Sequence, residues 1–184
     1  RSSKKYCYSV GGEFNEFGGA SGFRPSLNPF TGLTDDEFDE QQETITALLT
    51  MMAYDNEEQD RGARIAANEA VKAAWGQQGN KAEIATVIDC LERIVASAIE
   101  NPMRSEPVTA ALNLIPRLKA FIESPTRGVY FRGPSTLNPK KQLTVFELAS
   151  LGDDDHLKRC VLFCCLNVLM TRIRTVRGRK RIYV

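Results

Sequence analysis

Apolar positions recur at helical spacing through the middle of the chain. These one-sided stripes of apolar residues predict four helices. One begins at Thr34, one runs through the alanine-rich stretch 66–75, one follows Asn80, and one begins at Ser105 and stops before Pro125. The clearest stripe, in the third of these helices, contains Ile84, Val87, Ile88, Leu91, Ile94, Val95 and Ala98. Because each stripe lies on one side of its helix, we expect the four helices to pack as a bundle.

Start and stop signals support these four helices. Thr34 and Glu37 have the spacing of a capping box, and Asn56 and Asn80 each have a Gln or Glu three residues later. The second helix is expected to end at Gly76 or Gly79. The buried face expected for the fourth helix contains Val108, Ala111, Leu112, Ile115, Leu118 and Ile122.

Short strand patterns lie on either side of the helical block. After a short helix at 2–10, Glu13–Phe17 reads as a strand, and Leu143–Leu148 reads as a buried one. An apolar helix from about 156 to 174 and a strand at 181–184 follow, which is the strand–helix–strand order of a parallel sheet. The expected fold is therefore mainly α with a minor α/β part. Because residue 1 is Arg and the last strand is short, we expect an internal part of a larger protein.

Composition narrows the class of protein. Hydrophobic residues make up 42% of the 184 residues, charged residues make up 26%, and the net charge is +1. These values are ordinary for a globular protein and argue against a generally basic nucleic-acid coat. No stretch has the length and apolarity of a membrane span, and no signal-peptide pattern opens the chain. Five cysteines without framework spacing favour reduced thiols in a cytosolic compartment.

The parallel-sheet pattern calls for a search for a phosphate-binding loop. No G-x-x-x-x-G-K-[ST] occurs, and the glycine-rich stretches at 18–19 and 76–79 lack the lysine and the hydroxyl that follow in that loop. There is likewise no G-x-S-x-G, no H-E-x-x-H and no paired C-x-x-C. The sequence therefore predicts no catalytic, cofactor-binding or metal site within this chain.

His156, Cys160 and Cys164 share one helical face at four-residue spacing. Zinc is one interpretation, but consecutive residues of the three lie about 6 Å apart along the helix axis. The outer two are then too far apart to bind one tetrahedral ion. Packing of the cysteines in the core is the favoured interpretation.

The remaining candidate contacts are charged residues near the C-terminus. Glu147 interrupts an apolar strand near the end where parallel sheets bind ligands, although a surface or capping role explains it equally well. A basic run follows the last helix. Its residues either contact phosphates or form a solvated turn, and the solvated turn is favoured. The candidate ligand or partner contacts are Glu147, Arg172, Arg174, Arg177 and Arg179. Trp75 is interpreted as a core anchor.

Several stretches together resemble one family, in chain order. They are Arg1–Ser3, Gly11–Phe17, Leu27–Phe30, Ala73–Trp75, Tyr130–Gly133, Val145–Leu148, Leu157–Met170 and Arg179–Val184. These stretches resemble the TraC-type conjugative transfer ATPases of type IV secretion, in the region between their Walker A and Walker B motifs. The resemblance covers nearly the whole chain, and both nucleotide motifs fall outside it.

The resemblance implies a RecA-like P-loop ATPase that powers pilus and channel assembly in plasmid transfer. It divides the chain into a RecA-like segment at 1–33, an all-helical inserted subdomain at 34–125, and a RecA-like strand–helix–strand segment at 126–184. The implied cofactors of the parent protein are ATP and Mg²⁺, and this chain alone is expected to be inactive. The implied partners are other subunits and type IV secretion components, in the cytoplasm at the inner face of a bacterial inner membrane.

Two further functions stay open from the residues alone. One is an autonomous helical protein–protein interaction module without NTP chemistry. The other is a DNA-binding module that uses the basic C-terminal run, which would bind DNA with a steep dependence on salt.

Overall fold

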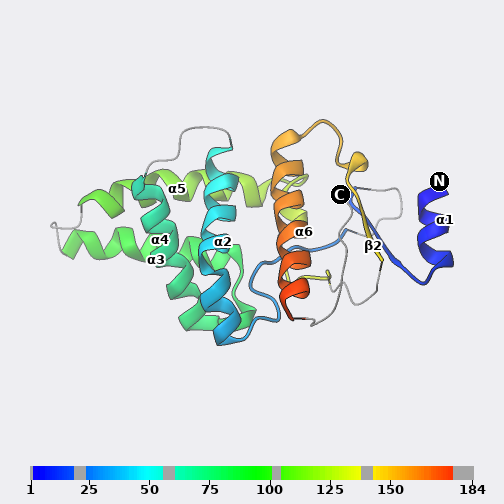
Figure 1. Cartoon of the computed structure of the whole chain (residues 1–184). Coiled ribbons are helices and arrows are strands. Elements are labelled where there is room, and N and C mark those ends of the chain that lie inside the picture. Colours follow the sequence, from blue (N-terminus) through cyan, green and yellow to red (C-terminus); the bar gives the residue numbers. More distant parts are fainter. Residues whose placement is uncertain (1, 19–23, 56–60, 101–104, 138–142, 176–184) are drawn as a thin grey trace. The chain divides into compact units, whose positions relative to one another are not determined.

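The computed structural model describes residues 2–18, 24–55, 61–100, 105–137 and 143–175. The chain divides into two compact units, each of which is described by itself. Unit 1 consists of Arg1–Pro25 and Leu137–Val184, and unit 2 is Ser26–Thr136. Unit 2 thus enters and leaves within the sequence of unit 1, as expected for a helical block inserted between sheet-forming segments (Figure 1).

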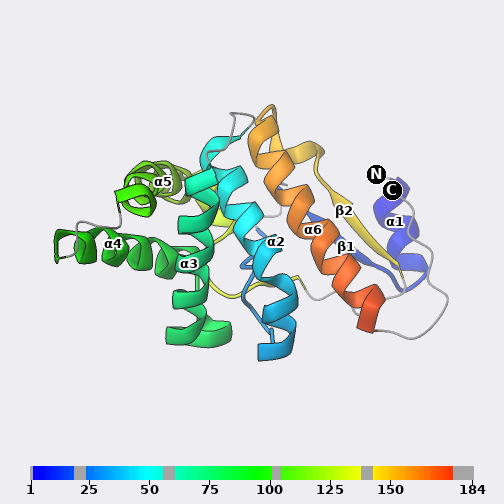
Figure 2. The same cartoon turned by 60° about the vertical axis from the view of Figure 1, so that its left-hand side comes forward.

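Unit 1 is built around two parallel strands from opposite ends of the chain. Strand β1 (Glu13–Glu16) pairs in parallel with β2 (Thr144–Glu147), and Phe14 lies opposite Val145 in the register. The strand pair lies between helix α1 (Ser2–Ser9) and helix α6 (Asp155–Thr175), as Figure 2 shows. Helices on both faces are the usual cover of a parallel sheet, so this small sheet has the layering of an α/β fold.

The amino-terminal end of α6 follows from the run of three aspartates. The backbone N–H of Leu157 donates to Oδ1 of Asp154 at 3.0 Å, so Asp154 caps the helix. Behind this cap, one side of α6 is buried. The buried apolar side chains of α6 are Leu157, Cys160, Val161, Cys164 and Cys165. A short 3₁₀ turn, η3 (Ala149–Leu151), connects β2 to the helix.

Unit 2 contains four helices that pack on one another. They are α2 (Asp35–Tyr54), α3 (Arg61–Gln78), α4 (Ile84–Glu100) and α5 (Ser105–Glu123). Helix α3 packs against each of the other three. Its buried face consists mostly of alanines, which let neighbouring helices approach closely. The fully buried ones are Ala63, Ala66, Ala67, Ala70 and Ala74. The predicted helical bundle is confirmed.

The helix caps match the sequence in part. Thr34 and Glu37 form the predicted capping box, in which Thr34 Oγ1 accepts from the Glu37 backbone and Glu37 bonds back to the Thr34 backbone. The predicted cap at Asn56 lies outside the described residues. The predicted cap at Asn80 is wrong, because Asn80 belongs to a 3₁₀ turn, η1 (Gly79–Lys81), and α4 begins only at Ile84.

The predicted buried face of α5 is also partly wrong. Leu112 is 53% exposed, whereas Leu114 and Phe121 are buried. Apolar residues surround much of this helix, so its sequence fits more than one face. Phe121, on the buried face, packs against Phe131 with ring centroids 5.6 Å apart.

The boundaries of unit 2 are wider than the predicted helical subdomain. They include the segment from Ser26 that leads into α2 and the 3₁₀ turn η2 (Gly128–Tyr130) that follows α5. These flanking segments pair with each other, since the Leu27 N–H donates to the Tyr130 carbonyl at 2.7 Å. The division into 1–33, 34–125 and 126–184 itself stays a prediction.

Candidate functional site

Glu147 lies at the carboxyl end of β2, where its carboxylate bonds to the backbone. Glu147 Oε1 accepts a hydrogen bond from the Ala149 N–H at 2.7 Å, and the Glu147 carbonyl accepts one from the Phe17 N–H at 3.0 Å. The side chain therefore bonds to the backbone at the start of the turn η3, which leads towards α6. A role of this partly exposed carboxylate in binding a ligand or partner stays a prediction.

A second carboxylate, Glu16, lies opposite Glu147 in the strand register. Its Oε2 forms an ion pair with Lys4 Nζ at 2.7 Å, and the ammonium group lies 5.4 Å from the centre of the Phe14 ring. The hydrogen bond to Glu16 raises the pKa of Lys4. Both carboxylates at the carboxyl ends of the two strands therefore bond to groups of unit 1 itself. Glu16 bonds to a side chain of α1, and Glu147 bonds to the backbone of the following turn.

The four arginines of the candidate contact set are placed only in part. Arg172 and Arg174 lie in the last turn of α6, a position where cations complement the helix dipole. The structure does not describe where their side chains lie. Arg177 and Arg179 are outside the described residues. Contact of these arginines with a nucleotide or nucleic acid stays a prediction.

The cysteines of α6 are buried. Cys160 is 0% exposed and Cys164 is 7% exposed, which confirms the core-packing interpretation of this helical face. Burial raises the pKa of Cys165 from 9.0 to about 12 and raises the pKa of Cys164 well above the ordinary value. The thiols of Cys164 and Cys165 are therefore protonated at neutral pH, the form least reactive as a nucleophile or metal ligand. None of the five cysteines, all of which lie within the described residues, forms a disulfide.

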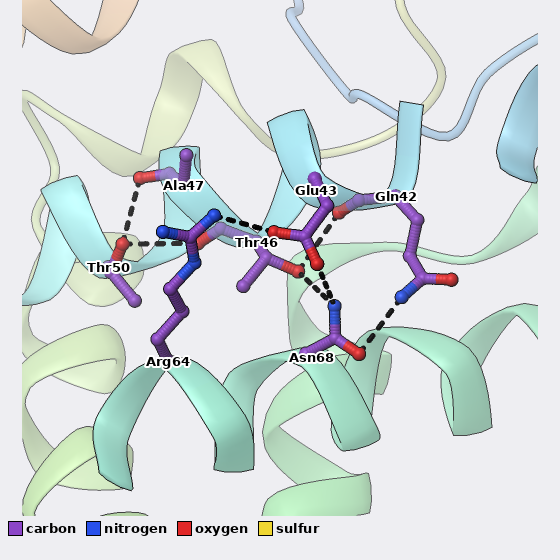
Figure 3. A network of polar contacts seen from close by, with 7 residues as sticks. All are labelled: Gln42, Glu43, Thr46, Ala47, Thr50, Arg64 and Asn68. Carbon is purple, nitrogen blue, oxygen red and sulfur yellow. Dashed lines mark hydrogen bonds and ion pairs between the residues drawn. The ribbon is translucent and has the colours of Figure 1, made fainter. Parts of the chain in front are cut away.

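Sequence reasoning missed a polar network between α2 and α3 (Figure 3). At its centre, the Asn68 amide donates to Glu43 Oε1 at 3.0 Å and accepts from Gln42 Nε2 at 2.9 Å. Arg64 adds an ion pair to the other carboxylate oxygen of Glu43 at 2.6 Å. Thr46 Oγ1 lies 3.4 Å from the Asn68 amide nitrogen and donates to the Gln42 carbonyl.

The network fixes how α2 and α3 face each other. Hydrogen bonds are directional, so Asn68 favours one rotation of α3 against Gln42 and Glu43, which the small alanines beside it do not. Arg64 and Glu43 are both more than half exposed, so their ion pair contributes little by itself. The sequence signal was a polar residue inside the alanine-rich stretch 63–74.

Neither a cluster of metal ligands nor a membrane-spanning helix occurs among the described residues. Among them, no three His, Cys, Asp or Glu side chains gather as a set of metal ligands. None of the helices in the described part of the chain combines the length and the apolarity needed to cross a membrane.

Comparison with known proteins agrees with the motif resemblance. No protein-family model matches the chain. Protein TraC of Escherichia coli (strain K12) is 29% identical to the chain over 98% of its length. The matched region is 20% of TraC, so the chain spans about a fifth of the length of this curated relative.

A solved structure, VirB4 of Thermoanaerobacter pseudethanolicus, has the same fold over 98% of the chain, with a TM-score of 0.72 and 17% identity. The matched part is 49% of the VirB4 chain. The order of the quoted motifs, the sequence match and the fold agree with one another. This chain is therefore similar to one region of TraC along nearly its whole length, and it has the fold of part of VirB4.

Proposed function

We propose that this chain is part of an ATPase of conjugative transfer, which powers assembly of a type IV secretion channel and its pilus. The similarity to TraC over 98% of the chain is the observation that carries the proposal. The motifs that resemble the TraC-type ATPases run through both units, from the strand β1 to the helix α6. The proposal thus concerns the whole chain and no single motif.

The architecture supports a position between two nucleotide motifs. In the proposed parent protein, β1 and β2 belong to a RecA-like sheet and α6 is one of the helices beside that sheet. Unit 2 is a helical insertion in this RecA-like domain. ATP and Mg²⁺ are bound by residues outside this chain, because the chain has no G-x-x-x-x-G-K-[ST]. The parent protein acts in the cytoplasm, at the inner face of a bacterial inner membrane.

Within this protein, unit 2 supplies contacts to other subunits or to type IV secretion components. Its helices bury their apolar faces on one another but leave some large apolar side chains exposed. Leu112 on α5 is 53% exposed and Ile65 on α3 is 43% exposed. Such side chains contribute to binding when a partner covers them, and they cost little stability when they are changed.

The contact role is tested by changing this surface in the longer parent protein. Leu112→Glu is expected to weaken association with other subunits or secretion components, as measured by pull-down and native mass spectrometry, while the thermal unfolding midpoint stays unchanged. Asn113→Glu is the matched control, since Asn113 is the next, also exposed, residue of α5. Equal association of both variants with every partner would contradict a contact role at this part of α5. Nucleotide binding by the longer protein tests the ATPase assignment separately.

A further inference from the structure

The segments that enter and leave unit 2 are joined around one buried serine. Ser26 is 7% exposed, and all of its hydrogen-bonding groups contact the exit segment. Its N–H donates to Thr136 Oγ1 at 3.0 Å, and its carbonyl accepts from the Thr136 N–H at 3.0 Å and from Ser135 Oγ at 3.0 Å. Its hydroxyl donates to the Arg132 carbonyl at 2.8 Å.

Two further bonds extend this pairing on either side. The Leu27 N–H donates to the Tyr130 carbonyl at 2.7 Å, and the Ser135 N–H donates to Thr31 Oγ1 at 2.8 Å. We call this set the Ser26 clasp. Its residues are Ser26, Leu27, Thr31, Tyr130, Arg132, Ser135 and Thr136.

The clasp is also attached to the start of α4. Beside it on the entry segment, the Asn28 side chain donates to the Ala82 carbonyl at 2.9 Å. On the exit segment, the Gly133 N–H donates to Glu83 Oε2 at 3.3 Å. Both segments thus reach the same turn before Ile84, and neither can leave the base of unit 2 without breaking bonds to it.

We propose that the Ser26 clasp is a conformational device, a closed base that makes the entry and exit segments of unit 2 move together. Hinge motions need a few residues that absorb changes in backbone angles. The clasp removes that freedom from the entry segment after Ser26 and from the exit segment before Thr136. Any bending is therefore confined to the residues just before Ser26 and just after Thr136. A displacement of either connection then reaches unit 2 as one movement of the whole unit. The hydrogen bonds of the clasp break together, in one cooperative step, while the helices of unit 2 stay folded. This inference does not depend on the ATPase assignment.

Amide hydrogen exchange on the full 184-residue chain tests this device. In the unsubstituted chain, the amides of Leu27, Ser135 and Thr136 are expected to share one protection factor, the intrinsic exchange rate divided by the observed one, and this factor should be smaller than that of buried Ala70 in α3. Thr136→Val keeps the side-chain shape but removes the oxygen that accepts from Ser26. It is expected to raise the exchange rates of all three clasp amides by about fivefold to tenfold, the effect of one lost hydrogen bond.

Thr136→Ser is the matched control, since it keeps the hydroxyl and should leave the three rates within about twofold of the original values. The Ala70 amide should keep its rate in both variants. Unrelated protection factors of the three amides in the unsubstituted chain, or an effect of Thr136→Val on one amide only, would overturn the proposal. An equal rise at Ala70 would also overturn it, because the clasp would then open only when the helices unfold.

Discussion

The indole ring of Trp75 stacks on the ring of Phe38, with ring centroids 4.4 Å apart and ring planes within 3° of parallel. The indole N–H also donates to Asp35 Oδ1 at 3.0 Å. Phe38 and Asp35 lie in the first turns of α2, and Trp75 lies in the last turn of α3. The contact joins one end of each helix, while the Asn68 network joins their middle parts. The predicted core anchor is thus partly exposed and holds a helix junction.

Trp75→Ala is expected to destabilise unit 2 by about 2 kcal/mol, less than a fully buried tryptophan would, because the ring is partly exposed. Trp75→Phe keeps a stacked ring but loses the bond to Asp35, so a loss of about 1 kcal/mol is expected. Urea unfolding followed by circular dichroism measures both. Equal losses for the two variants would show that the stacking contributes nothing.

Asn68→Ala should lower the free energy of unfolding by about 1 kcal/mol, because Gln42 and Glu43 lose their common partner. Asn68→Asp should cost more, since it replaces the donor to Glu43 with a second carboxylate that repels it. Asn113→Ala, at an exposed position of α5, is the control and should change stability by less than about 0.5 kcal/mol. Urea unfolding curves of the three variants measure these free energies. An Asn68→Asp variant as stable as the unsubstituted chain would contradict the network.

Two glycines should respond to alanine in opposite directions. At Gly128 an added Cβ would clash with the backbone carbonyl group of Ile122, so Gly128→Ala should destabilise unit 2 by at least about 2 kcal/mol. At Gly76, within α3, an added Cβ meets nothing within 4 Å, so Gly76→Ala should stabilise the helix by about 0.5–1 kcal/mol. Thermal unfolding midpoints should therefore fall for the first variant and rise for the second; shifts in the same direction would be inconsistent with the structure.

Stability should fall above pH 9 because of the buried thiols of α6. Burial raises the pKa of Cys165 from 9.0 to about 12, so above pH 9 the unfolded chain releases a proton that the folded chain keeps. The stability that the protonated thiol contributes is fully present below pH 9 and is lost between pH 9 and 12. In that range the free energy of unfolding falls by roughly 1.4 kcal/mol per pH unit for each such thiol.

Urea unfolding between pH 8.5 and 10 measures this slope, and Cys165→Ala should make it shallower. An unchanged slope in that variant would contradict the burial of the thiol. As a second measurement, a thiol reagent at neutral pH should modify the five cysteines rapidly only after denaturant is added, since the most exposed of them is 7% exposed.

Local patterns predicted the helices and strands of the described residues well, whereas the strand expected at 181–184 lies outside these residues. The capping box at Thr34 was read correctly because all of its atoms lie within four residues. The orientation of α5 was not, because Leu112 and Leu114 are equally apolar and the buried face packs against residues beyond the helix, such as Phe131. The start of α4 was missed because a 3₁₀ turn takes up Asn80.

Long-range relationships were beyond the reach of the sequence. The pairing of β1 with β2 joins residues from opposite ends of the chain, and no local pattern at Phe14 indicates Val145 as its neighbour. The bond from Ala149 to Glu147 depends on how the turn after β2 folds, so the apolar strand pattern alone left the role of this carboxylate open. The Ser26 clasp was missed for the same reason, since serine and threonine in loops carry little pattern.

Binding of a fluorescent ATP analogue in the presence of Mg²⁺ tests the central assignment most directly. It should be measured on this 184-residue chain and on a longer protein that adds the flanking coding sequence at both ends. The account predicts that only the longer protein binds the analogue, because the phosphate-binding loop lies outside the chain. Tight binding by the short chain, or no binding by either protein, would contradict it.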